Sequence, residues 1–383
     1  MRVRPGVVLL LIGWVAGWWL LARVPRLRTA PGALDPVGPA GEVSVIIPAR
    51  NEAGNLPHLL SSLEGQQPAP SQVIVVDDGS TDATSEVARR FGATVVESSP
   101  LPEGWTGKSW ACMQGADVAS GDTLVFLDAD TRLLPGGLGA VLTAHRRHGG
   151  LLSVQPYHRM VRAYERLSAV FNVIAVMGVG IATPGRAGRA RGAFGPCVVC
   201  RAEDYVRVGG HGAVADEILE DLALGRVFAD SGLPVRGAGG RGAIEFRMYP
   251  DGPGQLVEGW SKNVASGSAS IGVVRLVATI AWVCGAVASS VELVQWLVGS
   301  GSTATVGVWV AWAAYALQFG VMLRQLGNFG VWVALLYPLA FVAFVLVFFD
   351  SLWLTVVRRR VRWRGRTVPL PQRRRSSNRT RET

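Results

Sequence analysis

Apolar and polar positions alternate in short elements in the middle of the chain and form long apolar runs near both ends. Five short runs between residues 42 and 157 have the length and β-branched content of buried strands: EVSVIIPA, SQVIVVDD, ATVVES, DTLVFLDAD and LLSVQPY. Amphipathic stretches such as NLPHLLSSLEG and DATSEVARRFG lie between them and have the spacing of surface helices. Alternating strands and helices predict a mainly parallel, Rossmann-like α/β sheet with helices on both faces.

The outer regions contain apolar runs of membrane-spanning character. Residues 7–21 lie between flanking arginines, and no small-x-small cleavage site precedes the basic cluster, so we expect an uncleaved anchor. The runs 276–298, 303–323 and 329–349 are each long enough to cross ~30 Å of hydrocarbon. Three full spans would place the basic C-terminal tail outside, against the positive-inside rule. The last run, which Pro338 interrupts, is therefore a candidate re-entrant hairpin.

These patterns divide the chain into segments. They are a membrane anchor (1–24), a Pro/Gly linker (25–41), an α/β domain (42–270), membrane helices (271–350) and a basic tail (351–383). We expect a multi-pass protein of the cell membrane with the α/β domain in the cytoplasm. The apolar stretch 164–182 is either a buried helix or one that dips into the bilayer.

The positive charge is concentrated at the C-terminus. From Arg358 onward the chain has eleven Arg and one Glu, which accounts for the whole net charge of +10. Because this tail directly follows an apolar run, anionic lipid headgroups are favoured over nucleic acid as its partner. A single C-x-x-C, Cys197 and Cys200, lacks the further ligands of a zinc site and predicts a short buried strand instead.

Pairs of carboxylates follow two predicted strands: Asp77-Asp78 and Asp128-Ala-Asp130. Ligands of parallel α/β sheets bind beyond the carboxyl ends of strands. Two acids one residue apart repel each other unless a cation lies between them and a partner. Since Mg²⁺ and Mn²⁺ combine one or two protein carboxylates with phosphate oxygens, the D-A-D segment predicts a diphosphate-bound metal site. Taken alone, the same motif is also typical of a turn after a strand. The chain lacks the usual dinucleotide and ATP loops.

Five motifs in a fixed order extend this picture: VSVIIPARNEAGNL, VIVVDDGSTDAT, GWTGKSWACMQGA, D-A-D and ILEDLALG. In this order, over about residues 42–265, the chain resembles the inverting family-2 glycosyltransferases. The resemblance implies the GT-A fold and transfer of a hexose, with glucose favoured, from a UDP-sugar. The segments LLSVQPYH, FRMYPDG and EGWSKN, with the apolar C-terminal runs, further resemble the membrane-bound 4,4'-diaponeurosporenoate (carotenoid) glycosyltransferases. Hopanoid-associated glycosyltransferases share much of this pattern.

The resemblance also implies roles for individual residues. One of Asp77 and Asp78 would accept a hydrogen bond from the uracil N–H, and Lys108, one of only two lysines, would approach base or phosphate. Asp130, helped by Asp128, would hold Mg²⁺ or Mn²⁺. The implied nucleotide-sugar site comprises Pro48, Ala49, Arg50, Glu52, Asp77, Asp78, Lys108 and Asp128.

The segment DEILEDLALGRVF, residues 216–228, carries the implied catalytic acids on a predicted helix. Asp221 would be the general base with Glu220 in support. Asp216 and Glu217, one turn earlier, are the fallback. In-line attack would invert the anomeric centre and give a β-glycoside from an α-linked donor.

The acceptor side departs from the processive members of the family, which carry Q-x-x-R-W. Here QLVEGWSKN has Gln255 and Trp260 but no Arg. Trp260 would stack on a sugar or polyene and Lys262 would pair with an acid group or phosphate, or this segment is an interfacial helix. The favoured acceptor is a membrane isoprenoid, a carotenoid carboxylic acid first. The alternatives are a hopanoid or polyprenyl phosphate, or a non-catalytic sugar-nucleotide binder, against which Asp77, Asp130 and Asp221 argue.

Overall fold

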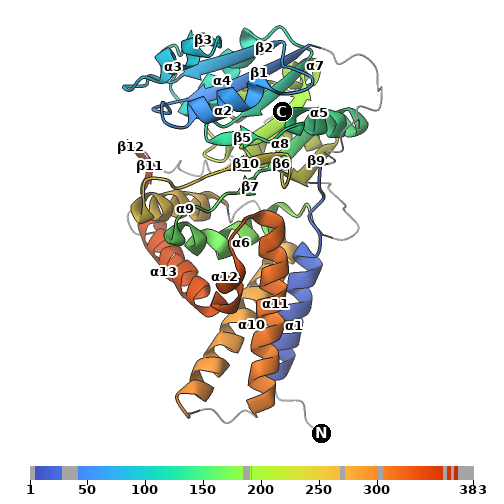
Figure 1. The fold of residues 1–383 in the computed structure, drawn as a ribbon, viewed down its shortest axis with the longest axis vertical. Helices are drawn as coiled ribbons and strands as arrows, with labels where there is room; N and C mark the ends of the chain where they lie inside the picture. Colours follow the sequence, from blue (N-terminus) through green and yellow to red (C-terminus); the bar gives the residue numbers. More distant parts are fainter. Residues whose placement is uncertain are drawn as a thin grey trace, which may run out of the picture.

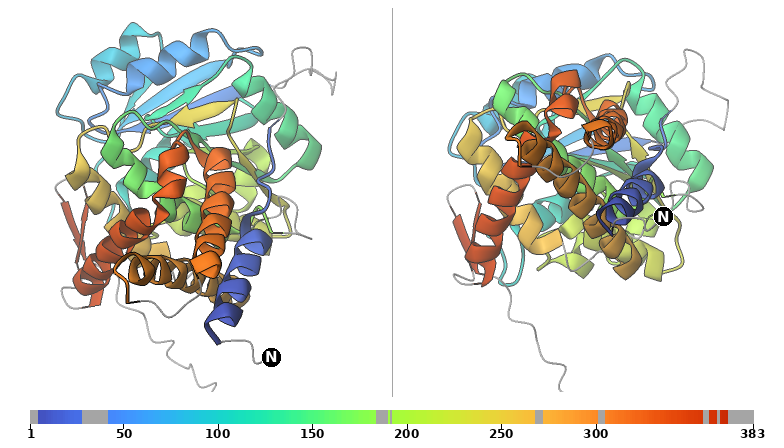
Figure 2. Two further views of the ribbon diagram at one scale, coloured as in Figure 1. Left: turned by 60° about the horizontal axis from the view of Figure 1, so that its bottom comes forward. Right: turned by 90° about the horizontal axis from the view of Figure 1, so that it is seen from below.

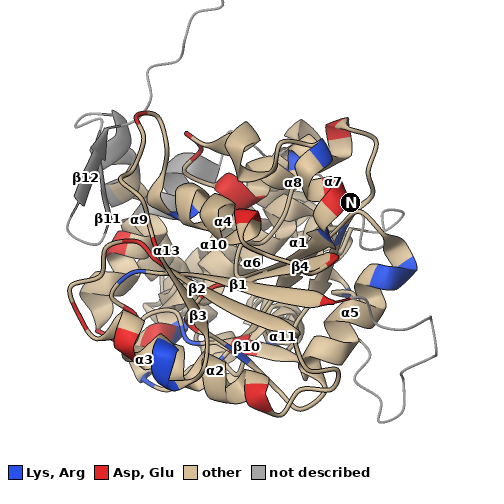
Figure 3. Cartoon of the chain, turned by 90° about the horizontal axis from the view of Figure 1, so that it is seen from above, with Lys and Arg blue, Asp and Glu red and all other residues tan. Residues whose placement is uncertain are grey.

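The computed structural model describes residues 5–27, 42–183, 190, 192–267, 272–300, 305–356, 360–363 and 366–369. Figure 1 shows an α/β domain stacked on a set of helices that come from both ends of the chain. Figure 3 views the chain from above, and over the described residues the Lys and Arg positions are interspersed with the Asp and Glu positions rather than gathered by sign. Most of the basic tail lies outside the described residues, so its expected contact with lipid headgroups stays a prediction.

A seven-stranded sheet forms the centre of the α/β domain, in the order β3-β2-β1-β4-β8-β6-β9. Its strands are β1 (Val43–Ala49), β2 (Gln72–Asp77), β3 (Thr94–Glu97), β4 (Thr123–Leu127), β6 (Leu151–Gln155), β8 (Cys197–Arg201) and β9 (Val235–Gly239). All neighbours are parallel except β8, which is antiparallel to both β4 and β6. The predicted mainly parallel sheet is confirmed, and both cysteines of the C-x-x-C are buried in β8.

Helices cover both faces of this sheet, which explains why its strands are continuously apolar. On one face Val45 and Ile47 of β1 pack with Leu59 of α2, and on the other Ile46 packs with Phe228 of α8. The covering helices are α2 (Leu56–Glu64), α3 (Thr84–Arg90), α4 (Gly107–Asp117), α5 (Gly137–His148), α7 (Ala202–Arg207) and α8 (Glu220–Asp230), with the 3₁₀ turn η2 (Gly210–Val214).

A second, three-stranded sheet lies below the first and was not predicted. It has the order β5-β10-β7, formed by β5 (Thr131–Leu133), β10 (Ile244–Phe246) and β7 (Tyr157–His158). The pair β5–β10 is antiparallel with Thr131 opposite Phe246. The chain that leaves β10 therefore runs back beside the D-A-D segment that precedes β5.

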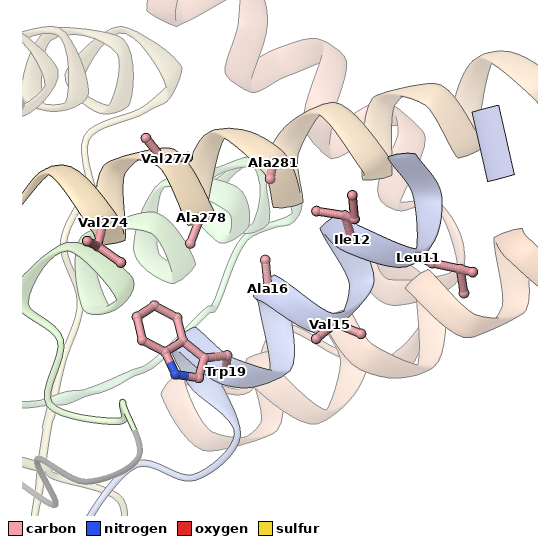
Figure 4. A pocket seen from close by; sticks show the side chains of 9 residues that line it. All are labelled: Leu11, Ile12, Val15, Ala16, Trp19, Val274, Val277, Ala278 and Ala281. Atoms are coloured by element: carbon pink, nitrogen blue, oxygen red, sulfur yellow. The ribbon is translucent and has the colours of Figure 1, made fainter. Parts of the chain in front are cut away.

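The helices α1 (Pro5–Leu21), α10 (Val273–Leu297) and α11 (Thr305–Leu326) lie side by side (Figures 1 and 2). By length and composition α10 and α11 qualify as membrane spans, whereas α1 is apolar but shorter. An apolar groove of about 580 Å³ runs between α1 and α10, with Trp19 and Val277 in its walls (Figure 4). Apolar side chains on these helices are exposed, as is usual for surfaces that face lipid.

The third C-terminal run is not one continuous helix. It is divided into α12 (Val331–Leu335) and α13 (Tyr337–Val356), so α13 begins one residue before Pro338. Figure 1 shows α13 running obliquely to the other helices and lying against α9 (Pro253–Gly267). The break fits Pro338, because proline cannot donate the backbone hydrogen bond that a continuous helix requires. The apolar stretch of α13 that the structure describes, Tyr337–Phe349, is shorter than α10 and α11. The hairpin itself stays a prediction.

The stretch 164–182 forms η1 (Ala163–Ser168) and α6 (Ala169–Val179), which lie between the α/β domain and the long helices. Most side chains of α6 are buried, which favours the buried-helix interpretation. One apolar core includes Leu20 of α1, Phe171 of α6, Trp282 of α10 and Phe319 of α11. The same core takes in Tyr249 from the segment after β10, so it joins the α/β domain to the helices.

Candidate active site

Lys108 lies at the centre of a cluster of three carboxylates. Its Nζ is 2.8 Å from Asp128 Oδ1, 3.0 Å from Glu220 Oε1 and 3.0 Å from Asp221 Oδ2. The four residues come from the start of α4, the end of β4 and the start of α8. The structure therefore brings together four of the residues that the sequence motifs singled out.

Local hydrogen bonds hold the start of α4 in place. Thr106 is its N-cap and accepts a hydrogen bond from the backbone N–H of Ser109 at 3.4 Å. The N–H of Thr106 donates to the carbonyl of Ala215 at 2.8 Å. Lys108 is thus held close to the segment that leads into α8.

Asp128 is fixed by the backbone around the end of β4. Its N–H donates to the carbonyl of Pro196, and its own carbonyl accepts from the N–H and hydroxyl of Thr131. Glu220 and Asp221 begin α8, where the positive end of the helix dipole stabilises carboxylates.

Gly195 lies against the cluster, and only glycine fits there. A Cβ at this position would lie 2.0 Å from Asp221 Oδ2 and 3.0 Å from Lys108 Nζ. Any larger residue would displace the carboxylate or the chain. Sequence reasoning missed Gly195, because its contacts join segments far apart in the chain.

The charges of the cluster do not balance, since one ammonium faces three carboxyl groups. Burial raises the pKa of Asp221 to about 8, with Lys108 opposing and Glu220 and Asp128 adding to the rise. Burial lowers the pKa of Lys108, but the charges of Asp128, Asp221 and Glu220 outweigh it and hold that pKa well above its ordinary value. The cluster therefore attracts either a proton or a further cation.

The donors near the D-A-D segment fit a divalent metal bound together with a ligand. Among the described residues, no three His, Cys, Asp or Glu side chains are grouped as a complete metal site. Mg²⁺ and Mn²⁺ need fewer protein ligands when phosphate oxygens complete their coordination. Asp128 and the half-buried Asp130 supply hard oxygen donors of that kind. Because Lys108 pairs with Asp128, a metal there would have to share or displace this ion pair.

Asp77 and Asp78 differ in what they contact. The Asp77 carboxylate is buried and accepts hydrogen bonds from the Ser80 N–H and the Ser85 hydroxyl, so it shapes its own loop. Asp78 is one-fifth exposed and lies 3.5 Å from Arg50 Nη1. Of the two carboxylates, that of Asp78 is the one more accessible to a ligand.

The remaining predicted donor-site residues lie at the end of β1. The carbonyl of Ala49, which follows Pro48, accepts the N–H of Asp78 at 2.8 Å. Glu52 is buried; its Oε2 accepts from the Asn55 amide, and its N–H donates to the Thr84 hydroxyl. We therefore interpret Glu52 as shaping the loop after β1.

The sequence pattern placed the fallback acids on a helix, but in the structure they lie before it. Helix α8 begins at Glu220, because Leu219 has non-helical dihedral angles (φ −109°, ψ 65°). Asp216 and Glu217 are exposed in the preceding turn. The acids that meet Lys108 are Glu220 and Asp221 instead.

Trp260 is in the core rather than on an open surface. It is 5% exposed and stacks on Phe171, with ring centroids 4.8 Å apart and planes at 20°. Phe171 covers one face of the indole. The stacking of Trp260 on a sugar or polyene, and the alternative of an interfacial helix, both stay predictions. The side chain of Lys262 lies outside the described residues.

Comparisons with known proteins agree with these features. Residues 44–183 match the profile of "Glycosyl transferase family 2". The 4,4'-diaponeurosporenoate glycosyltransferases of Staphylococcus aureus strains MRSA252 and USA300 are 38% identical, over 85% of this chain and 87% of each relative. A mannosyltransferase from Pyrobaculum calidifontis, solved with GDP-Man and Mn²⁺, is similar in structure. Its TM-score is 0.53 at 19% identity, over 91% of this chain and 95% of that one, which supports the GT-A-like fold.

Proposed function

Because the chain belongs to glycosyl transferase family 2, we propose that it is a membrane-bound, inverting enzyme that moves a hexose, glucose first, from a UDP-sugar to a lipophilic isoprenoid. The observation that carries this proposal is the contact of Lys108 with Asp128, Glu220 and Asp221 at the end of β4. A carotenoid carboxylic acid is the acceptor we favour, because the relatives that share most of their length with this chain are named for one.

The donor would lie across the carboxyl ends of β1, β2 and β4. Asp78 would accept a hydrogen bond from the uracil N–H, with Arg50 beside it. Lys108 would face the phosphates, because its ammonium lies next to the D-A-D segment. A bound Mg²⁺ or Mn²⁺ would neutralise charge on the leaving diphosphate. Asp130 and Asp128 would hold it.

In the transfer step an acceptor oxygen attacks the anomeric carbon on the face opposite UDP. The new C–O bond forms as the bond to the diphosphate breaks, and the electron pair of that bond stays on the phosphate oxygen. An alcohol acceptor must also lose its proton, which Asp221 would take. A carboxylic acid has already lost its proton at neutral pH and needs no base. Glu220 would support Asp221 from the adjacent position of α8.

The proposal is tested with the full chain purified in detergent, UDP-glucose, Mg²⁺ and 4,4'-diaponeurosporenoic acid. We expect UDP release and a glucosyl ester, identified by mass spectrometry, with a β-linkage by NMR. Asp117→Asn, an exposed change on α4, serves as the control variant with normal turnover. Turnover only with a hopanoid or a polyprenyl phosphate would reject the carotenoid acceptor. No turnover with any lipid extract would reject the enzyme itself.

A further inference from the structure

Two buried hydrogen-bond donors lie between the active site and the apolar helices. The Tyr249 hydroxyl and the Trp260 Nε1 have no hydrogen-bond partner among the described residues. Their side chains are nonetheless only 4% and 5% exposed. Buried polar groups in folded proteins almost always have a partner, so an orphaned pair at one place indicates a missing acceptor.

Tyr249 lies beside the D-A-D segment. The antiparallel register of β5 and β10 pairs Thr131 with Phe246, so the chain beyond Phe246 runs back past Asp130. Burial, and then the nearby charge of Asp130, raise the pKa of Tyr249. The hydroxyl is therefore close to the place where we locate the metal and the diphosphate.

The segment that carries Tyr249 is firmly held. Just before it, Arg247 forms a half-buried ion pair with Glu165 of η1, at 2.6 Å and 2.9 Å. The hydroxyl of Tyr164 donates to the Tyr249 carbonyl at 2.6 Å. On the other side, a Cβ on Gly259 would lie 2.7 Å from Tyr249 Cε1, so α9 approaches this closely only because residue 259 is glycine.

Aromatic rings continue from these donors toward the long helices. The rings of Tyr249 and Trp260 are 6.5 Å apart, Trp260 stacks on Phe171 of α6, and Phe171 meets Phe344 of α13 edge-on at 4.9 Å. The donors thus lie at the border between the acidic cluster and an apolar core. A molecule with one oxygen-bearing end and a long apolar body would suit this place, because its oxygen could meet the donors and its body the apolar core.

We propose that Tyr249 and Trp260 bind the oxygen-bearing end of the lipophilic acceptor and present it to the anomeric carbon. The Tyr249 O–H and the Trp260 N–H donate to one oxygen of a carboxylate, and its other oxygen makes the attack. Both donors are neutral, so they orient the carboxylate and leave its negative charge in place. This inference rests on the proposed function, because it concerns the acceptor of that same reaction.

The test compares 4,4'-diaponeurosporenoic acid with its methyl ester, which has the same polyene but no anionic oxygen. Dissociation constants are measured by equilibrium gel filtration of the full chain in detergent, with the absorbance of the polyene as the readout. Hydrogen bonds to a charged oxygen are roughly twice as strong as those between neutral groups. The wild type should therefore bind the acid more tightly than the ester.

Tyr249→Phe and Trp260→Phe remove one donor each and keep an aromatic ring. We expect each to weaken binding of the acid about tenfold, to change binding of the ester less than about twofold, and to leave the KM for UDP-glucose unchanged. Tyr157→Phe is the matched control, because it also removes one phenolic hydroxyl, from a half-buried tyrosine stacked under Arg241. It should change none of these constants.

The outcomes separate this inference from the proposed function. If the wild type binds the acid and both variants bind it equally well, the inference is wrong and the proposed function stands. Equal losses for the acid and the ester would show that the two residues serve packing, which also overturns the inference. If the wild type binds neither compound, the carotenoid acceptor and the inference fall together.

Discussion

Lys108 Nζ and Asp221 Oδ2 lie 3.0 Å apart although 113 positions separate the two residues in the chain. This contact ties the start of α4 to the start of α8 and places the ammonium against the candidate base. It also opposes the effect of burial on the pKa of Asp221. The predictions below follow from this arrangement and its surroundings.

Replacing the candidate base should affect two kinds of acceptor differently. Asp221→Asn keeps the shape of the side chain and removes its basicity. With a polyene alcohol we expect the single-turnover rate to fall by roughly 10²–10⁴, the usual contribution of a positioned base. With the matched polyene acid the fall should be clearly smaller, because no proton has to be removed. Equal losses would assign Asp221 to binding or structure and would move the role of base to Glu220.

The pH dependence should also differ between the two acceptors. Burial raises the pKa of Asp221 to about 8, so its basic form accumulates only as the pH rises through that value. We expect kcat/KM for an alcohol acceptor to increase up to about pH 8 and then level off. The profile for an acid acceptor should lack this limb. In Lys108→Met the rise of kcat/KM should move to higher pH, since the ammonium that lowers the pKa of Asp221 is gone. A rise at an unchanged pH would contradict the assignment of Asp221 as the base.

Asp130→Ala tests the metal site. We expect it to abolish transfer and strongly weaken UDP-glucose binding in Mg²⁺ or Mn²⁺, because the diphosphate would lose its counter-cation. EDTA should have the same effect on the wild type, and added Mn²⁺ should reverse it. Isothermal titration calorimetry with UDP-glucose gives the binding constants. Full transfer activity in EDTA would show that the D-A-D segment does not hold a metal needed for transfer.

Gly195→Ala tests the packing of the active site. The added methyl group would overlap Asp221 Oδ2, so we expect at least a tenfold loss of transfer rate and a loss of about 1–3 kcal/mol in stability. Gly65→Ala is the matched control, because the space around it is open and its φ is an ordinary −100°. Rates and thermal unfolding of the two variants should be compared side by side. A Gly195→Ala enzyme with normal rate would mean that Asp221 has room to move.

Membrane attachment can be tested by washing membranes in high salt. The protein should stay in the membrane fraction, because burial of the apolar faces of α1, α10 and α11 is not screened by salt, whereas attraction of the tail to headgroups is. Immunoblotting of pellet and supernatant gives the result. Release by salt alone would show that these helices are core helices of a soluble protein.

The sequence predicted the central sheet and much of the candidate site for one physical reason. Apolar runs of strand length are a strong local signal, and the carboxyl ends of parallel strands meet at one edge, which brings Asp78 and Asp128 to the same side. The start of α8 was predicted one turn too early, because the apolar pattern continues through Leu219 while its backbone is not helical. The β5-β10-β7 sheet has strands of two or three residues, too short to show a period. Gly195 and Tyr249 act through contacts between distant segments, which no local pattern contains.

The apolar core that joins the α/β domain to the helices has a consequence for how the proposed acceptor would reach the enzyme. Leu20, Phe171 and Tyr249 belong to one packed core, and the Gly239 N–H donates to the Pro25 carbonyl at 2.7 Å where the chain leaves α1. These contacts hold the α/β domain in a fixed position relative to α1, α10 and α11. In the proposed membrane setting its reaction centre stays at one height above the bilayer. Lipophilic acceptors would then reach it by lateral diffusion in two dimensions, and only a molecule whose head rises to that height would react.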